Sequence, residues 1–362
     1  MSELESKLNA LRGLMQKKNV DVVLLQKVSS FAWATGGSST AINISSSNGE
    51  GALLVTTKDQ HLVANNIEAV RLTGEEELGK KGWGVFQFNW WESSKAVETL
   101  APGLRLGSDT PMAGAVDLGA EIARLRAALL PVEQDRIREV SRLCASAMSQ
   151  AIHAVRPGMT EFEIGSLLAK ASLERGLEAI VNLIAVDERI HSYRHPTYTA
   201  KKLDRYAMIV LCGRKYGLVV SITRLIHFGK LPAELSRRAE ACARVDAAMI
   251  AATLPGRTLG QVFSDTQAAY AAVGFDGEWK LHHQGGPAGY EAREFIAVPG
   301  SPDGGLDGQA YAWNPSITGV KSEDTVLVTG TGHEVMTEIP GWPVYEIEAG
   351  HELIKRPKVL EV

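Results

Sequence analysis

The pattern Pro-Gly-x-Thr marks an internal repeat in this chain. Pro157-Gly158-Met159-Thr160 returns 98 residues later as Pro255-Gly256-Arg257-Thr258, and Gly176-Leu177 then matches Gly274-Phe275 in the same register. In each copy a helical pattern precedes the Pro-Gly turn, a second one follows it and ends at glycine, and a strand-like segment comes next. The pattern indicates a duplicated α/β unit whose copies pack about a pseudo-two-fold axis. A cleft between two such halves is a natural place for a ligand.

The residues before the repeat have a different pattern. Three apolar runs bounded by polar turns are typical of buried strands: Val20–Leu25, Gly51–Thr57 and His61–Ala64. Near Leu130-Pro131-Val132 the pattern changes to long helices, the first over Glu133–Val155. We therefore expect a mixed α/β (α+β) fold with a small α/β domain at residues 1–132 and the duplicated domain at residues 133–362.

Composition limits the partners and the compartment. The 38 Lys and Arg residues against 42 Asp and Glu give a net charge of −4, which argues against nucleic acid and anionic membranes as partners. Apolar runs such as Ala207–Cys212 are far shorter than the ~20 residues of a membrane span, and Met1–Lys18 lacks the apolar core of a signal peptide. Cys144, Cys212 and Cys242 suit a reducing compartment. We expect a soluble, cytoplasmic protein.

Two polar segments of the second domain contain histidines. His195 lies in His191–Pro196, and because its imidazole titrates near neutrality it is a candidate acid or base. The glycine-rich segment Leu281–Glu294 contains His282 and His283. If that backbone is extended, alternation turns His283 away from His282. The alternatives are a surface histidine in the first segment and a purely structural bend in the second.

Acidic residues lie beside basic ones in the remaining segments. Gly319–Val328 enters a strand with Glu323 and Asp324 on opposite faces, so one carboxylate should face the core and need a partner. Arg293 and Glu294 form a charged pair in which the guanidinium is able to bind a carboxylate in two-pronged fashion. A solvated strand start and a satisfied Arg–Glu pair are the structural alternatives.

In this order, the segments resemble the creatinase/prolidase/aminopeptidase P/methionine aminopeptidase family of "pita-bread" hydrolases. The phrases that carry the resemblance are Pro157–Glu161, His195-Pro196, Ser221–Arg224, His282–Glu294 and Glu323–Thr329. The resemblance covers essentially the whole chain and implies a pita-bread domain after a small α/β domain. It also implies a homodimer in which the N-terminal domain of one subunit reaches the other's cleft, with Thr35–Asn48 and Asn89–Trp91 as candidate contacts.

The resemblance raises the question of metal binding. The family's metallopeptidases hold two metal ions with two Asp, one His and two Glu. The corresponding positions in this sequence are Leu211, Ser221, Gly286, Asn314 and Glu323. One carboxylate cannot hold two ions, because each divalent ion needs several anionic or imidazole ligands. We therefore expect no catalytic metal and no other cofactor; a mononuclear site of His195, His282 and Glu323 is the alternative.

Within the family, creatinase cleaves a C–N bond without metal. His195 and His282 resemble its catalytic histidines in position, and Gly289–Glu294 resembles its Gly-Leu-Glu-Leu-Arg-Glu phrase. Creatinase has glutamates where this chain has Thr223 and Asn314, so the main attraction for a cationic guanidinium is missing. The resemblance thus implies creatinase-like chemistry on a substrate other than creatine.

The sequence predicts a metal-independent hydrolase or lyase that cleaves a C–N or C–O bond of a small, carboxylate-bearing substrate. The predicted catalytic residues are His195, His282 and Glu323. The predicted substrate-binding residues are Ser221, Arg224, Arg293, Glu294, Asn314 and Lys321. Two alternatives are a prolidase-like or Xaa-Pro aminopeptidase-like metallopeptidase and a non-catalytic, peptide-binding pita-bread module.

Overall fold

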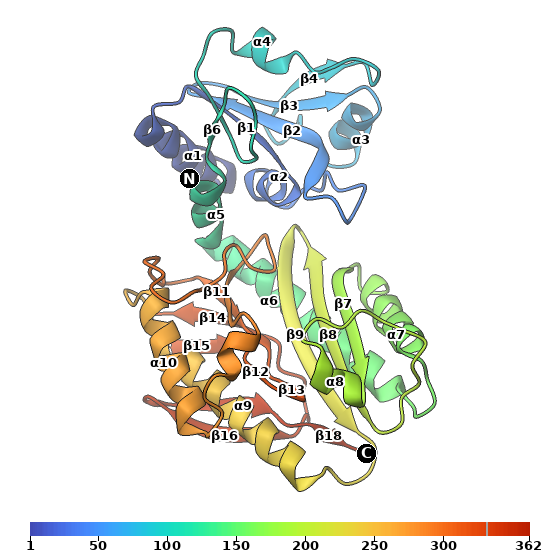
Figure 1. Cartoon of the computed structure of the whole chain (residues 1–362). Helices are drawn as coiled ribbons and strands as arrows, with labels where there is room; N and C mark the ends of the chain where they lie inside the picture. The colour runs from blue at the N-terminus through green and yellow to red at the C-terminus, as the bar shows by residue number, and fades with distance from the viewer. Residues whose placement is uncertain (331) are drawn as a thin grey trace. The chain divides into compact units, whose positions relative to one another are not determined.

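The computed structural model describes residues 1–330 and 332–362 (Figure 1). The chain folds into two compact units, which are Met1–Ala127 with Tyr216–Leu218, and Ala128–Lys215 with Val219–Val362. Both units combine helices with sheets, so the predicted mixed α/β class is confirmed. The assignment of residues 1–132 to a creatinase-type domain stays a prediction.

A six-stranded mixed sheet forms the first unit, in the order β4-β3-β2-β1-β5-β6. Its strands are β1 (Val22–Lys27), β2 (Asn48–Thr56), β3 (Gln60–Asn65), β4 (Gly84–Phe88), β5 (Leu106–Ser108) and β6 (Val116–Asp117). Its helices are α1 (Glu3–Lys18), α2 (Val28–Thr35), α3 (Glu68–Gly74), α4 (Ala96–Leu100) and α5 (Gly119–Ala127). The three predicted strands are confirmed as β1, β2 and β3. On one face of the sheet, Val22, Leu54 and Val63 pack together in a buried cluster.

The second unit contains two four-stranded sheets, ordered β18-β9-β8-β7 and β10-β11-β14-β15, and the small pairs β12-β13 and β16-β17. Its strands are β7 (Glu178–Val186), β8 (Tyr206–Lys215), β9 (Leu218–His227), β10 (Gly285–Ala288), β11 (Ala310–Trp313), β12 (Ser316–Ile317), β13 (Val320–Lys321), β14 (Asp324–Thr329), β15 (Gly332–Val335), β16 (Val344–Ala349), β17 (Glu352–Pro357) and β18 (Leu360–Glu361). Its helices are α6 (Pro131–Ala154), α7 (Glu161–Leu173), α8 (Glu188–Ser192), α9 (Ala233–Ala252), α10 (Leu259–Ala272) and the 3₁₀ helix η1 (Glu278–Leu281).

The sequence repeat corresponds to two matching helix pairs, α6–α7 and α9–α10. Thr160 is the N-cap of α7 and Thr258 is the N-cap of α10, and in both cases the hydroxyl accepts a hydrogen bond from the backbone N–H three residues on. Gly176 and Gly274, just beyond the two helices, adopt left-handed conformations with φ of +68° and +79°. The local chemistry of the repeat is therefore the same in both copies.

The helices of the second unit pack against its sheets. Helix α6 contacts β8 and α7 contacts β7, while α9 lies against β11, β16 and β17 (Figure 1). Met249 and Ile250 of α9 share one buried core with Val210 of β8, Trp313 of β11 and Val326 of β14. Within the described residues, none of the helices combines the length and the apolar content that a membrane crossing requires.

Candidate active site

Three histidines from two segments meet in the second unit. His195 follows α8, whereas His282 and His283 follow η1. The Nε2 atoms of His195 and His282 lie 3.1 Å apart, and one ring nitrogen from each of the three histidines lies within 4.8 Å of the others. The structure thus brings together the two histidines that were predicted to be catalytic and adds His283 to them.

The expectation that His283 turns away from His282 is wrong, because the two ring centroids are 4.7 Å apart. Successive side chains point to opposite faces only where the backbone forms a regular β-strand. His282 is extended, with φ −154° and ψ 145°, but β10 begins only at Gly285. Gln284 is buried like His282; its side chain donates to the His282 carbonyl and accepts from the Tyr270 hydroxyl. The sequence signal that could have indicated His283 as a member of the site is its position next to His282, just before the glycine-rich strand.

A buried carboxylate holds the loop that carries His195. Glu161, at the start of α7, is fully buried and accepts from the backbone N–H of Val186 and from the N–H and hydroxyl of Thr199. It also pairs with Arg189 at 2.5 Å, and Arg189 donates to the Thr197 carbonyl. The loop between α8 and β8 is therefore tied down on both sides of His195.

A second ion pair joins this loop to the segment that carries the other two histidines. Arg194 donates to Glu278 of η1 at 2.6 Å and to the Thr318 hydroxyl at 3.0 Å. Glu278 also accepts from the Thr318 N–H. Two residues before Thr318, the Ser316 hydroxyl lies 3.2 Å from Nδ1 of His282. These contacts leave Nε2 of His282 directed at His195, and they fix the relative positions of the two imidazoles.

Glu323 is buried between cations. Its Oε1 accepts from Arg293 at 2.8 Å, and its Oε2 accepts from Lys321 at 2.8 Å and from the Thr223 hydroxyl at 2.5 Å. Arg293 also donates to the Ser221 hydroxyl at 2.9 Å. Burial by itself would raise the pKa of Glu323, but Lys321 and Arg293 outweigh it and bring the pKa to about 2. Glu323 is therefore ionised at neutral pH.

Burial and the same cations keep the histidines neutral. Burial lowers the pKa of His282 to about 2, helped by the charge of Lys321, and lowers the pKa of His283 to about 4, helped by Arg293. The pKa of His195 is also lowered, first by burial and then by Lys321. At neutral pH the cluster therefore consists of uncharged imidazoles, each with one N–H donor and one acceptor nitrogen.

The other predicted substrate-binding residues take different places around this cluster. The amide of Asn314, which is buried, has its Nδ2 3.4 Å from Nε2 of His282, and its Oδ1 has no hydrogen-bond partner. Glu294 accepts from the Tyr290 N–H at 2.8 Å, so this carboxylate closes the glycine-rich turn. Arg293, which was expected to form a charged pair with Glu294, forms the ion pair with Glu323 described above.

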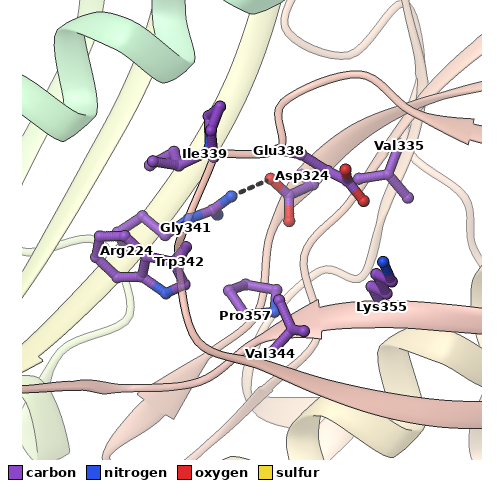
Figure 2. Close-up of a pocket in the computed structure, with 11 residues that line it drawn as sticks. Arg224, Asp324, Val335, Glu338, Ile339, Gly341, Trp342, Val344, Lys355 and Pro357 are labelled. Atoms are coloured by element: carbon purple, nitrogen blue, oxygen red, sulfur yellow. Dashed lines mark hydrogen bonds and ion pairs between the residues drawn. The ribbon is translucent and has the colours of Figure 1, made fainter.

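Arg224 is engaged within the fold, although it was predicted to bind substrate. Its Nη2 donates to Asp324 at 2.8 Å and to the Thr337 carbonyl at 3.0 Å, and its guanidinium lies 5.7 Å from the Trp342 ring centroid. Figure 2 shows the Arg224–Asp324 pair in a pocket of about 330 Å³ that Trp342 also lines. The second oxygen of Asp324 pairs with the fully buried Arg356. Both acids at the start of β14 are thus buried and paired, Glu323 with one set of cations and Asp324 with another.

The residues at the family's metal positions do not fit a dinuclear metal centre. Leu211 offers no ligand atom, and the hydroxyl of Ser221 is taken by Arg293. A Cβ on Gly286 would lie 2.4 Å from the Phe295 carbonyl oxygen, so the backbone leaves no room for a side chain there. Both oxygens of Glu323 are in ion pairs. The three histidines are near enough together to share one ion, but they stand in the positive field of Lys321 and Arg293.

Comparison with known proteins agrees with this architecture. The model of metallopeptidase family M24 matches residues 135–330, which is more than half of the chain. The agropine synthesis cyclase of Rhizobium rhizogenes is 26% identical over 213 residues, covering 51% of this chain and 52% of that protein. An uncharacterized peptidase of Staphylococcus aureus (strain MW2) is 23% identical over 61% of this chain and 65% of its own length. The chain thus spans between half and two thirds of these curated relatives.

The fold matches solved structures over nearly the whole chain. The prolidase from Pyrococcus horikoshii OT3 superposes with a TM-score of 0.76 at 21% identity, covering 96% of this chain and 100% of that one. This likeness defines the class of protein as one with the pita-bread fold. The chain belongs to metallopeptidase family M24. The resemblance to this family noted in the sequence is therefore confirmed.

Proposed function

We propose that this protein is a hydrolase or lyase that uses histidines instead of metal ions to cleave a C–N or C–O bond of a small, carboxylate-bearing substrate. The observation that carries the proposal is the 3.1 Å contact between Nε2 of His195 and Nε2 of His282. The ionised carboxylate of Glu323 nearby is paired with two cations, Arg293 and Lys321. Of the five family positions, only Glu323 is a carboxylate in this sequence, whereas a dinuclear centre needs several.

The two histidines have different tasks in this proposal. His195 is the more exposed and takes a proton from an attacking water, then returns it to the leaving nitrogen or oxygen as the C–N or C–O bond breaks. His282 has a pKa of about 2, so it stays uncharged and acts as the hydrogen-bonding partner that orients His195. One proton serves the contact between the two imidazoles, with one ring donating and the other accepting.

The charges around Glu323 favour an anionic substrate. Lys321 and Arg293 carry two positive charges against the single negative charge of Glu323. We therefore assign the substrate carboxylate to the side of the site where these cations lie, with Ser221 and Asn314 as neutral hydrogen-bonding groups. Because Arg224 and Glu294 are engaged elsewhere, this proposal keeps them as supports of β14 and of the glycine-rich turn.

The relationship to the agropine synthesis cyclase widens the chemistry to be tested. That relative is named for a ring-closing reaction. Ring closure onto a carboxylate and ring opening by water are the two directions of one equilibrium, so a histidine base beside an anion-binding group is suited to either. Lactones and lactams therefore belong in the substrate panel beside amides and amidines.

The proposal also includes that the protein forms a homodimer and is located in the cytoplasm. The first unit carries an exposed aromatic pair, Trp90 and Trp91, which are 61% and 63% exposed with rings in an edge-to-face arrangement at 5.6 Å. Ile42 and Ile44, in the other candidate contact segment, are 58% and 64% exposed. Exposed apolar groups of this size are typical of contact surfaces. Light scattering should give a dimer for the wild type and a monomer for Trp90→Ala/Trp91→Ala.

The test is a substrate screen in which each reaction is followed by mass spectrometry. The panel contains N-acyl and amidino amino acids, lactones, lactams and Xaa-Pro dipeptides, each with EDTA and, separately, with Mn²⁺. We expect turnover that EDTA does not affect and that His195→Ala lowers by about 10²–10⁴. His351→Ala, at an exposed histidine, is the matched control. Activity that needs Mn²⁺ would favour the prolidase-like alternative, and full activity of His195→Ala would refute the proposed role.

A further inference from the structure

The two cations that contact Glu323, Lys321 and Arg293, have a second role besides substrate binding. Glu323 is the one carboxylate that this chain retains among the family's five ligand positions, and both of its oxygens contact cationic side chains at 2.8 Å. We propose that the ammonium group of Lys321 is a fixed internal cation that takes the place of a metal ion at this carboxylate. The positive charge at the site then belongs to side chains of the protein itself, with Arg293 as the second cation.

The placement of Lys321 is rigid. Its side chain is 5% exposed and that of Glu323 is 3% exposed, so water screens the pair little. Lys321 lies on β13, directly opposite Ser316 of β12 in the antiparallel register. Ser316 is the residue whose hydroxyl contacts Nδ1 of His282. One short hairpin therefore fixes both the cation and the orientation of the central imidazole.

The charge of Lys321 acts on all three histidines. It is among the causes that lower the pKa of His195, His282 and His283. A field that disfavours a proton on these nitrogens also disfavours a divalent cation bound to them, because both are positive charges at the same place. The positive field has the opposite effect on an oxygen that becomes negative during bond cleavage, which it stabilises. This catalytic part of the inference rests on the proposed function, whereas the exclusion of metal does not.

The backbone supports the same conclusion independently of charge. In the family's pattern, a histidine ligand stands where this chain has Gly286, and the Phe295 carbonyl oxygen occupies the space that its Cβ would need. The strand therefore passes closer to its neighbour than a ligand side chain allows. The glycine at position 286 and the ammonium group of Lys321 therefore both support a site that works without a metal ion.

Metal binding gives the decisive experiment. The wild type, purified without chelator, is analysed for bound metal, and Co²⁺ is then titrated into wild type, Lys321→Met and Lys280→Met while the visible absorption of histidine-bound cobalt is recorded. Lys280 is an exposed lysine two residues before His282, so its replacement removes the same charge from a solvated position. We expect metal-free wild type, at least tenfold tighter Co²⁺ binding in Lys321→Met, and no change in Lys280→Met.

Two results would overturn the inference. They are stoichiometric metal in the purified wild type, and a Lys321→Met variant that binds Co²⁺ no more tightly than the wild type. If Lys321→Met does not fold, Lys321→Gln replaces it, because the amide keeps a hydrogen bond to Glu323 while the charge is lost. Lys321→Arg, which retains the cation, should bind Co²⁺ as weakly as the wild type. None of these measurements needs turnover, so the inference can stand if His195→Ala proves fully active.

Discussion

Acid should weaken the fold through His282 in a way that can be calculated. This imidazole is 8% exposed, and burial with the nearby Lys321 lowers its pKa from 6.5 to about 2. Below about pH 6.5 the unfolded chain binds a proton at this residue that the folded chain does not bind. Stability is therefore fully present above pH 6.5 and is lost as the pH falls from there toward 2. At 1.36 kcal/mol per pH unit, moving from pH 7 to pH 5 costs about 2 kcal/mol from His282 alone.

Urea unfolding at pH 7 and pH 5 tests this number. His283, with a pKa of about 4, adds to the loss in the same pH range, whereas Glu323 contributes mainly below pH 4.5. The variant His282→Asn has no titrating group at this position, so its loss between the two pH values should be smaller than that of the wild type by about 2 kcal/mol.

The change in the free energy of unfolding between pH 7 and pH 5 separates the effect of protonation from the effect of lost packing. Replacing His282 also removes its contacts with Ser316 and His195, which lowers stability at both pH values alike. His351→Asn, at an exposed histidine, is the control and should keep the wild-type slope. An unchanged pH dependence in His282→Asn would show that this histidine is not held neutral by the fold, and the electrostatic description of the site would be wrong.

Three further changes test contacts that hold the site in place. Glu161→Gln weakens the pairing with Arg189 and should cost about 2–3 kcal/mol; hydrogen exchange should then rise between residues 188 and 199, and unchanged protection there would contradict the role of this carboxylate. Arg356 pairs with the buried Asp246 as well as with Asp324. Arg356→Met leaves Asp246 without its cation, while Asp324 keeps Arg224, and should cost about 3–5 kcal/mol in urea unfolding. Adding Asp246→Asn should restore part of this loss. Gly286→Ala places a Cβ 2.4 Å from a carbonyl oxygen and should cost about 1–3 kcal/mol; an unchanged melting temperature would mean that the strand has room for a side chain.

Local interactions made much of the fold predictable. The caps at Thr160 and Thr258 join residues three apart, so the chain carries the information for them within one helical turn. The glycines that end α7 and α10 adopt backbone angles that other residues avoid, and this preference is also local. For this reason the repeat, the ends of its helices and three of the six strands of the first unit could be predicted from short stretches of sequence.

The site is less predictable because its contacts are long-range. His195 and His282 are 87 positions apart in the chain, and nothing local to either shows that their Nε2 atoms meet. The position of His283 depended on where β10 begins, and strand registers are set by partners on other strands. The role of Arg224 depended on which acid at the start of β14 lies on its side of the strand.

The duplicated α/β architecture and the family could be predicted from the sequence alone, because both follow from residue identity and local pattern. The partners of Glu323 and of the histidines became known only from the folded structure. It placed Lys321 and Arg293 on Glu323 and gathered three neutral imidazoles, because buried charges must find partners wherever the chain brings them.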